Sequence, residues 1–110
     1  MEYATLAALA EPNRMKIVEF LLIKPASVGE IADRLVLRQP QASKHLKVLC
    51  AHGWIEAQPR SKTHVYQLRA SGFKELEQWL ESFRKIWEAN YDRLDAVLKE
   101  LKSKEKGELP

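Results

Sequence analysis

The segment from Gln39 to Gly53 constrains the fold most, because its apolar and polar residues separate at helical spacing. Ala42, Leu46 and Leu49 recur at i, i+4 and i+7, a pattern that predicts one buried stripe along a helix. Gly53 suits the left-handed conformation in which many helices end. Cations and amides collect in the first turns and on the opposite side, namely Arg38, Gln39, Gln41, Lys44 and Lys47. We therefore expect a helix with an apolar back and a basic, amide-rich front.

Length and composition predict one soluble domain. A chain of 110 residues can enclose a single core, and 45% apolar with 30% charged residues is ordinary for a globular protein. The one cysteine, Cys50, excludes an internal disulfide and an all-cysteine metal site. No apolar run reaches the roughly 18 residues of a membrane span, and no signal-type segment precedes Pro12. We expect a cytoplasmic protein, with residues 1–110 in one domain and no membrane partner.

The charges are distributed unevenly along the chain. The net charge is only +3, yet the segment from Arg34 to Lys74 holds eight cations and a single acid, Glu56. A basic middle between balanced or acidic ends is typical of a nucleic-acid-binding surface, and a solvated face without a partner is the alternative. Because this segment includes the front of the predicted helix, double-stranded DNA is the expected partner.

Two helices are predicted before residue 25. Residues 3–10 carry apolar side chains at i, i+3, i+4 and i+7 but are too few for a helix that is stable alone, so they should pack against another element. A second helix is expected to begin near Pro12 and to stop before Pro25. Its apolar face is predicted to contain Ile17, Val18, Leu21 and Leu22.

A third short helix is predicted from the capping-box pattern of Ser27 and Glu30, a hydroxyl followed three residues later by a carboxylate. Its inward residues are expected to be Val28, Ile31, Ala32 and Leu35. This helix, a tight turn and the basic helix together predict a helix-turn-helix over residues 28–53.

The residues from 54 to 68 change to a β-type pattern. Two short runs, 54–57 and 63–68, flank a polar turn that contains a proline. We expect a two-stranded hairpin, or wing, whose tip carries Arg60 and Lys62. These long cationic side chains could reach the minor groove or the DNA backbone.

A last helix is predicted from about Gly72 to about Lys102, with Ser71 as its N-cap. Its apolar positions step by three and four residues and are Phe73, Leu76, Leu80, Phe83, Trp87, Asn90, Leu94, Val97 and Leu101, of which only Asn90 is polar. Further apolar residues widen the stripe, namely Trp79, Ile86, Tyr91 and Leu98. Such a helix exceeds what a domain of this size can cover, so we expect its surplus seam to pair with a second copy.

Two features of this seam stay open. Asn90 either fixes the register of paired helices or marks a polar break where the helix leaves the core. Trp79 and Trp87 are expected in the core or the interface, with a pocket for a small-molecule effector as the alternative.

The order of these motifs resembles the ArsR (arsenic-repressor) family. The resemblance covers about residues 3 to 100 and depends on Glu11-Pro12-Asn13-Arg14, on the run from Gln39 to Leu49 with its Ser43-Lys44-His45-Leu46 core, and on Gly53-Trp54-Ile55. It implies a mainly α winged helix-turn-helix with a small β-hairpin, in the order of four helices, two strands and a fifth helix. It also implies a homodimer that represses transcription from a pseudo-palindromic operator.

The resemblance further implies which residues pair the two subunits, through helices at residues 1–10 and 72–102. The expected interface residues are Tyr3, Leu6, Phe83, Trp87, Asn90, Tyr91, Leu94, Val97 and Leu98. The family's metal sites use a cysteine pair near Ser27 or histidines on the last helix, and this chain has neither. The resemblance therefore points to a branch that lacks a metal site and includes autorepressors, and we expect no cofactor.

The expected DNA contacts come from the basic helix and the wing: Arg38, Gln39, Gln41, Ser43, Lys44, His45, Lys47, Arg60 and Lys62. For His45 two interpretations stand equal, a DNA contact or a half-buried bond to a neighbouring helix. Cys50 is expected to be a core residue rather than a redox thiol. A winged helix that binds an acidic protein is the alternative function. An enzyme is not expected, because no catalytic constellation is recognisable.

Overall fold

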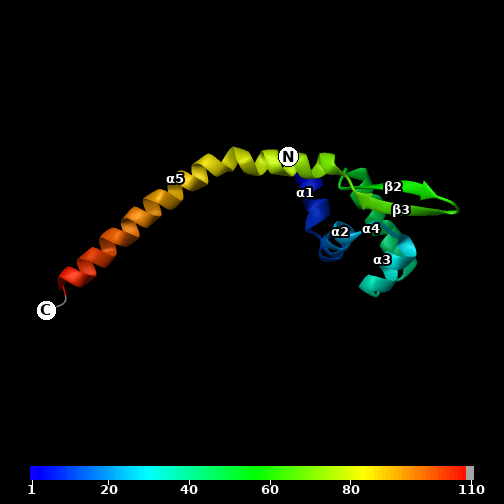
Figure 1. Ribbon diagram of the computed structural model, residues 1–110, viewed down its shortest axis with the longest axis horizontal. Helices are drawn as coiled ribbons and strands as arrows, with labels where there is room; N and C mark the ends of the chain where they lie inside the picture. The colour runs from blue at the N-terminus through cyan, green and yellow to red at the C-terminus, as the bar shows by residue number, and fades with distance from the viewer. Residues whose placement is uncertain (109–110) are drawn as a thin grey trace. The chain divides into compact units, whose positions relative to one another are not determined.

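The computed structural model describes residues 1–108, and the side chains of residues 1–104. The order of elements (Figure 1) is α1 (Tyr3–Ala10), α2 (Pro12–Ile23), β1 (Ala26–Ser27), α3 (Val28–Leu35), α4 (Gln39–Ala51), β2 (Ile55–Arg60), β3 (Thr63–Leu68) and α5 (Ala70–Glu108). Residues 1–76 form one compact unit, and the rest of α5 forms a second. Along the described chain, none of the helices combines the length and apolar character needed to cross a bilayer.

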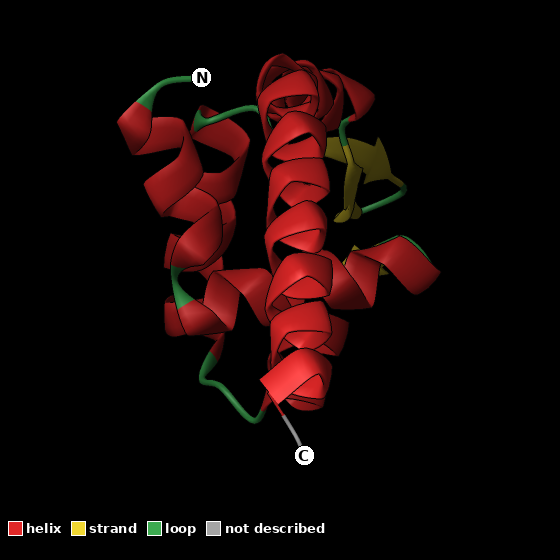
Figure 2. Cartoon of the chain, turned by 90° about the vertical axis from the view of Figure 1, so that its left-hand side faces the viewer, coloured by secondary structure: helices red, strands yellow, loops and turns green. Residues whose placement is uncertain are grey.

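The first unit is a helical body with a small sheet (Figure 2) and one hydrophobic core. The core takes side chains from four helices and the sheet, namely Ala8, Ile17, Val18, Leu21, Ala26, Ile31, Leu46, Leu49, Trp54 and Ile55. Trp54 is fully buried, and its indole Nε1 donates a hydrogen bond of 2.7 Å to the carbonyl of Thr5. The indole thereby ties α1 to the start of β2.

The bounds of α1 and α2 are as predicted, but the apolar face predicted for α2 was wrong at one residue, Leu22. Pro12 begins α2, and the carboxylate of Glu11 caps it by accepting from the backbone N–H of Arg14 at 2.8 Å. Leu22, predicted to face the core, is 75% exposed. Ile17, Val18 and Leu21 already fill the side of α2 that its neighbours cover, and Leu22 lies beyond the edge of that stripe.

The apolar stripe predicted on α1 lies on its outer side. Tyr3 is 86% exposed, whereas Ala8 is buried and Leu9 packs against the core. The helix is thus apolar on two sides, and tertiary contacts cover only the one with Ala8 and Leu9. The outer side carries Tyr3, which is exposed, and Leu6, which is partly exposed.

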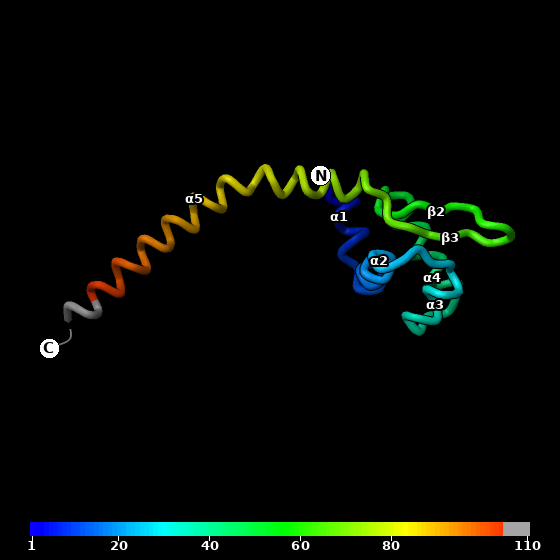
Figure 3. Tube along the Cα trace, viewed as in Figure 1, coloured from blue at the N-terminus to red at the C-terminus, as the bar shows by residue number. Residues whose placement is uncertain are grey.

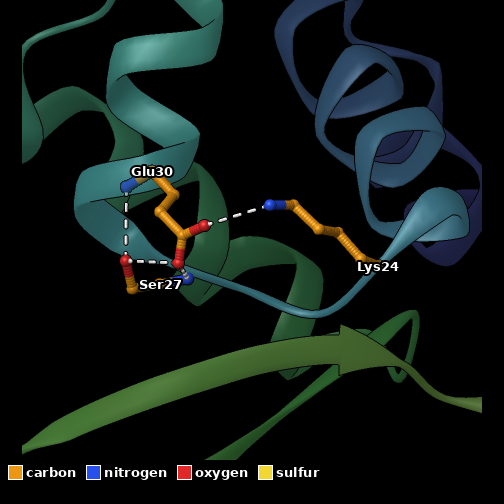
Figure 4. A network of polar contacts seen from close by, with 3 residues as sticks. All are labelled: Lys24, Ser27 and Glu30. Atoms are coloured by element: carbon orange, nitrogen blue, oxygen red, sulfur yellow. Dashed lines mark hydrogen bonds and ion pairs between the residues drawn. The ribbon is translucent and has the colours of Figure 1, made fainter.

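The predicted capping box at the start of α3 is present (Figure 4). The Ser27 hydroxyl accepts from the Glu30 N–H at 3.3 Å, and the Glu30 carboxylate accepts from the Ser27 N–H at 3.3 Å. Lys24 lies 3.5 Å from the same carboxylate. At the other end Val36 adopts the left-handed conformation, with φ of 56°, and turns the chain toward α4. The helix-turn-helix is therefore formed by α3 and α4.

The sheet has three strands rather than the predicted two. Strand β1 pairs antiparallel with β3, and the order is β1-β3-β2. The hairpin (Figure 3) is also tighter than predicted, because Pro59 pairs with His64 inside the ladder and only Ser61 and Lys62 separate the strands. Proline is tolerated there since β2 is an edge strand. The predicted turn was therefore too long.

Helix α5 begins at Ala70, two residues earlier than predicted, and extends to Glu108. Ser71 thus lies inside its first turn, and its prediction as N-cap was wrong. Just before α5, the backbone N–H of Arg69 donates to the carbonyl of Trp54 at 3.0 Å, which satisfies one of the donors at the start of the helix. Gly72 then packs against the backbone of Gly53, which has the positive φ of 76° expected after α4.

Candidate nucleic-acid interface

Helix α4 has the two sides that its sequence predicts. Ala42, Leu46 and Leu49 are buried in the core. The structure exposes every predicted DNA-contacting side chain except His45, namely Arg38, Gln39, Gln41, Ser43, Lys44, Lys47, Arg60 and Lys62. Six of these eight residues lie on α4 or directly before it. Four of the six, namely Gln39, Gln41, Ser43 and Lys44, lie within the first two turns of the helix and carry an amide, a hydroxyl or a cation. The arrangement can donate to base edges and attract phosphates at one end of the helix.

The two glutamines of α4 have defined surroundings. The carbonyl Oε1 of Gln41 accepts from the backbone N–H of Arg38 at 3.2 Å, which satisfies a donor at the helix start. In this arrangement Gln41 offers a base edge its amide N–H groups. The Nε2 of Gln39 would lie 3.5 Å from a β-carbon built on Gly29, so this amide lies close to the start of α3.

His45 contacts the helix that follows α1. Its Nδ1 lies 3.3 Å from Nη1 of Arg14 and 3.7 Å from Oε2 of Glu11. Arg14 also donates through Nε to the carbonyl of Ala8. The motif residues Glu11 and Arg14 thus connect α4 to α1 and α2, and a contact of His45 with DNA stays a prediction.

Burial raises the pKa of Glu11, but hydrogen bonds and charges outweigh it. Hydrogen bonds from the backbone N–H groups of Arg14 and Asn13, together with the electrostatic effects of His45 and Arg14, favour the carboxylate, and the net effect lowers the pKa of Glu11. The carboxylate at the start of α2 is therefore the stable form in the folded protein.

A recess of about 410 Å³ lies between the start of α3, the first residue of α4 and the wing. Its lining includes Ser27, Gly29, Gln39, Lys62, His64 and Tyr66. The sequence-based prediction did not include His64 or Tyr66 in the site. The sequence pattern that could have identified them is the alternation of side chains along a strand, which places residues 64 and 66 on the same face of the sheet.

Cys50 is half-buried near the end of α4, and burial raises the pKa of its thiol. Such a thiol is poorly reactive, in line with its interpretation as a packing residue. Within the described chain, no three His, Cys, Asp or Glu side chains come together as a group that could hold a metal ion.

The apolar seam of α5 is exposed along the second unit. Each of its large side chains from residue 80 onward is at least 38% exposed, namely Leu80, Phe83, Ile86, Trp87, Tyr91, Leu94, Val97, Leu98 and Leu101. Trp87 and Tyr91 stack with ring centroids 6.2 Å apart, and Trp79 meets Phe83 edge-on at 5.2 Å. Asn90 is exposed within this seam. An apolar surface of this extent is typical of a protein interface.

Comparison with known proteins places this architecture in a family. A helix-turn-helix domain family matches residues 9–56. The chain is 40% identical over 76 residues to the HTH-type transcriptional regulator Rv2034 of Mycobacterium tuberculosis, covering 69% of this chain and 71% of that protein. It is 33% identical over 75 residues to the transcriptional activator HlyU of Vibrio cholerae, covering 68% and 69%.

Solved structures agree with these relatives. The crystal structure of the ArsR family transcriptional regulator RHA00566 superimposes with a TM-score of 0.70 at 28% identity, covering 77% of this chain and 93% of that one. This chain and that regulator therefore share a fold. The chain belongs to the ArsR family of winged helix-turn-helix, DNA-binding transcriptional regulators.

Proposed function

We propose that the protein is a homodimeric repressor that binds a pseudo-palindromic operator in a promoter. The observation that carries this proposal is the exposed, basic and amide-rich first half of α4, held in place by its buried back of Ala42, Leu46 and Leu49. A helix presented in this way fits the major groove of B-DNA. The wing cations Arg60 and Lys62 then contact the minor groove or the neighbouring backbone.

Within this surface, contacts to phosphates supply most of the affinity and contacts to base edges select the site. Gln41 and Ser43 suit base edges because they donate neutral hydrogen bonds, and Gln39, the first residue of α4, suits either a base edge or a phosphate. Lys44 and Lys47 suit either a guanine edge or a phosphate. Arg38, just before α4, suits the backbone at the groove edge.

Two copies are expected to assemble through the outer side of α1 and the seam of α5. The outer side of α1 has a shallow concavity of about 380 Å³ lined by Tyr3, Leu6, Ala7, Ala10 and Glu11. On α5 the proposed interface consists of Phe83, Trp87, Asn90, Tyr91, Leu94, Val97 and Leu98. In such a dimer the two α4 helices would read half-sites about 34–36 Å apart.

The proposed repressor does not respond to metals, since the sequence lacks a cysteine pair and any histidine beyond His64. Regulation would then depend on the protein's own concentration or on an organic effector. The aromatic side chains of the α5 seam are where an apolar effector would be sought first.

The test of DNA binding is fluorescence anisotropy on duplexes selected from a random pool, with scrambled duplexes as reference. We expect much tighter binding to the selected sequence. Lys44→Ala should weaken specific binding by about 1–3 kcal/mol if the lysine reads a base, and should mainly reduce the salt dependence if it contacts a phosphate. Lys16→Ala removes the same charge from a groove between α2 and α3 and serves as the matched control. Equal, weak binding to all duplexes would instead favour a protein-interaction module.

The test of assembly is sedimentation of Trp87→Glu beside the unchanged protein. A buried charge in the seam should convert a dimer into a monomer, because an unpaired interfacial charge is costly. Glu88→Gln changes an exposed neighbour on the other side of α5 and should leave the dimer intact. A Trp87→Glu protein that stays dimeric would place the interface elsewhere.

The direction of regulation has a second candidate, activation, because the relative HlyU is named an activator. In vitro transcription from a promoter carrying the selected operator separates the two. Reduced transcript supports repression, and increased transcript supports activation.

A further inference from the structure

Two residues that line the recess beside the wing, Gln39 and Lys62, are among the proposed DNA contacts, but the recess itself has been assigned no ligand. It lies between two elements that are proposed to meet DNA, the first residue of α4 and the turn that begins β3. Its volume of about 410 Å³ is many times the roughly 30 Å³ of one water molecule, so a hydrated anionic group has room to enter.

The groups lining this recess are suited to an anion. Lys62 contributes a full positive charge, His64 an imidazole and Gln39 an amide, and the eight residues that line the recess include no acid. The pKa of Tyr66 is raised, mainly by burial and to a smaller extent by the nearby Cys50. Its hydroxyl therefore keeps the proton that it could donate. The recess is thus lined by donors of both charged and neutral kinds.

Glu30, the acid that directly follows the lining residue Gly29 in sequence, already has partners. The Glu30 carboxylate accepts from the Ser27 N–H and lies 3.5 Å from Nζ of Lys24 (Figure 4). Because the capping box uses the hydroxyl and N–H of Ser27, we assign no ligand contact to Ser27 or to the helix start itself. Lys62 is therefore not neutralised by a carboxylate among the residues that line the recess.

The position of the recess identifies the anion. In duplex DNA a sugar-phosphate backbone separates the major groove from the adjacent minor groove. A recess between a helix suited to the major groove and a wing suited to the minor groove faces this backbone.

We propose that the recess binds one phosphodiester group of the DNA backbone per protomer, held by Lys62, His64 and Gln39. This inference rests on the proposed DNA binding and adds His64 to the DNA-contacting residues. Such a contact positions the protein on the duplex without reading sequence, so it acts equally on selected and unrelated DNA.

The first experiment measures salt dependence with a selected duplex and a scrambled duplex. Each phosphate contact contributes about 0.9 to the slope of log K against log salt, which corresponds to about 8-fold in affinity between 1 M and 0.1 M salt. Lys62→Ala should weaken binding to both duplexes and flatten the slope, because it removes a cation. His64→Ala should weaken binding to both duplexes, because it removes a group that holds the phosphate. Lys16→Ala, which removes a cation outside the proposed DNA surface, should leave the slope unchanged.

The second experiment locates the phosphate. Single methylphosphonate substitutions, which remove one backbone charge at a time, are introduced along the selected duplex. For the unchanged protein, a methylphosphonate should reduce affinity at one position per half-site in addition to the positions that α4 contacts. For His64→Ala, which has already lost this contact, a methylphosphonate at that same position should cause no further loss. Gly29→Leu fills the recess without changing the charge and should behave like His64→Ala: it should bind the unmodified duplex more weakly and be insensitive to the methylphosphonate at that position. A melting curve confirms that the Gly29→Leu protein is folded.

The outcomes separate this inference from the proposed function. If the unchanged protein binds no duplex, both are overturned. If it binds its selected duplex while His64→Ala and Gly29→Leu retain its affinity, salt slope and methylphosphonate profile, DNA binding stands and the phosphate site in the recess is refuted.

Discussion

The contact between Gly72 and Gly53 gives a test in which steric packing opposes helix propensity. Gly72 lies in the first turn of α5, where alanine would ordinarily stabilise the helix by about 1 kcal/mol. A β-carbon at this position would lie 2.5 Å from the carbonyl oxygen of Gly53 and 3.2 Å from Cε3 of Trp54. Gly72→Ala should therefore destabilise the protein, the opposite of what propensity alone predicts.

The magnitude follows from how far the neighbours must move. A β-carbon contact below 3.0 Å is essentially never seen, so the two backbones must separate by at least 3.0 − 2.5 = 0.5 Å. Trp54 is fully buried and bonded to Thr5, which leaves little freedom for that movement. Overpacking costs about 1–3 kcal/mol, and because these neighbours have little freedom to move we expect the upper part of that range, about 2–3 kcal/mol. After the gain in propensity of about 1 kcal/mol, the expected net loss is about 1–2 kcal/mol.

The assay is thermal unfolding followed by circular dichroism at one fixed protein concentration, because assembly would shift the midpoint. A loss of about 1–2 kcal/mol should lower the midpoint by roughly 5–10 °C. Ser71→Ala, an exposed change one residue earlier, should leave it nearly unchanged. A Gly72→Ala protein as stable as the unchanged one would refute the argument that close backbone approach requires glycine here.

Two further predictions concern the turn after α3 and the start of α2. Val36 is 90% exposed at a φ of 56°, so Val36→Gly should relieve left-handed strain without losing packing and raise stability by about 0.5–1 kcal/mol in urea unfolding; a lower urea midpoint would contradict this. Glu11 has a pKa below its ordinary value of 4.5, so its carboxylate contributes stability that is present above that pH and is lost as the pH falls through the lower pKa of the folded state. Glu11→Gln should be less stable than the unchanged protein at neutral pH and should lose less stability on acidification. The measurement is the urea midpoint of both proteins between neutral pH and about pH 3. Equal pH profiles would contradict the stabilising role of this carboxylate.

Local signals in the sequence were enough to define the helical part of the fold. Pro12 marks the start of α2, Ser27 and Glu30 form the capping box of α3, and Gly53 takes the left-handed conformation after α4. Each signal acts within one turn of its own residue, through a fixed φ, a side-chain cap or a missing β-carbon. The basic front of α4 was predictable for the same reason, since its apolar back fixes which side faces outward.

Tertiary contacts decided the rest. Strand β1 has only two residues and exists because β3 lies beside it. Pro59 is accepted in β2 because, among the residues that the structure describes, no strand pairs on the other edge of β2. Leu22 is as apolar as its neighbours in sequence, but no element of the described chain covers it. His64 lines a recess only because the hairpin turn brings it toward α3.

The sequence by itself determined the period of each element, the caps of its helices and the separation of basic from apolar residues around α4. Only the tertiary structure decided which of two apolar sides of α1 is buried, that His45 meets Glu11 and Arg14, and that Gly72 must stay small against Gly53. The physical reason is range. Dihedral preference and capping act between residues a few positions apart, whereas burial and close approach depend on residues that folding alone brings together.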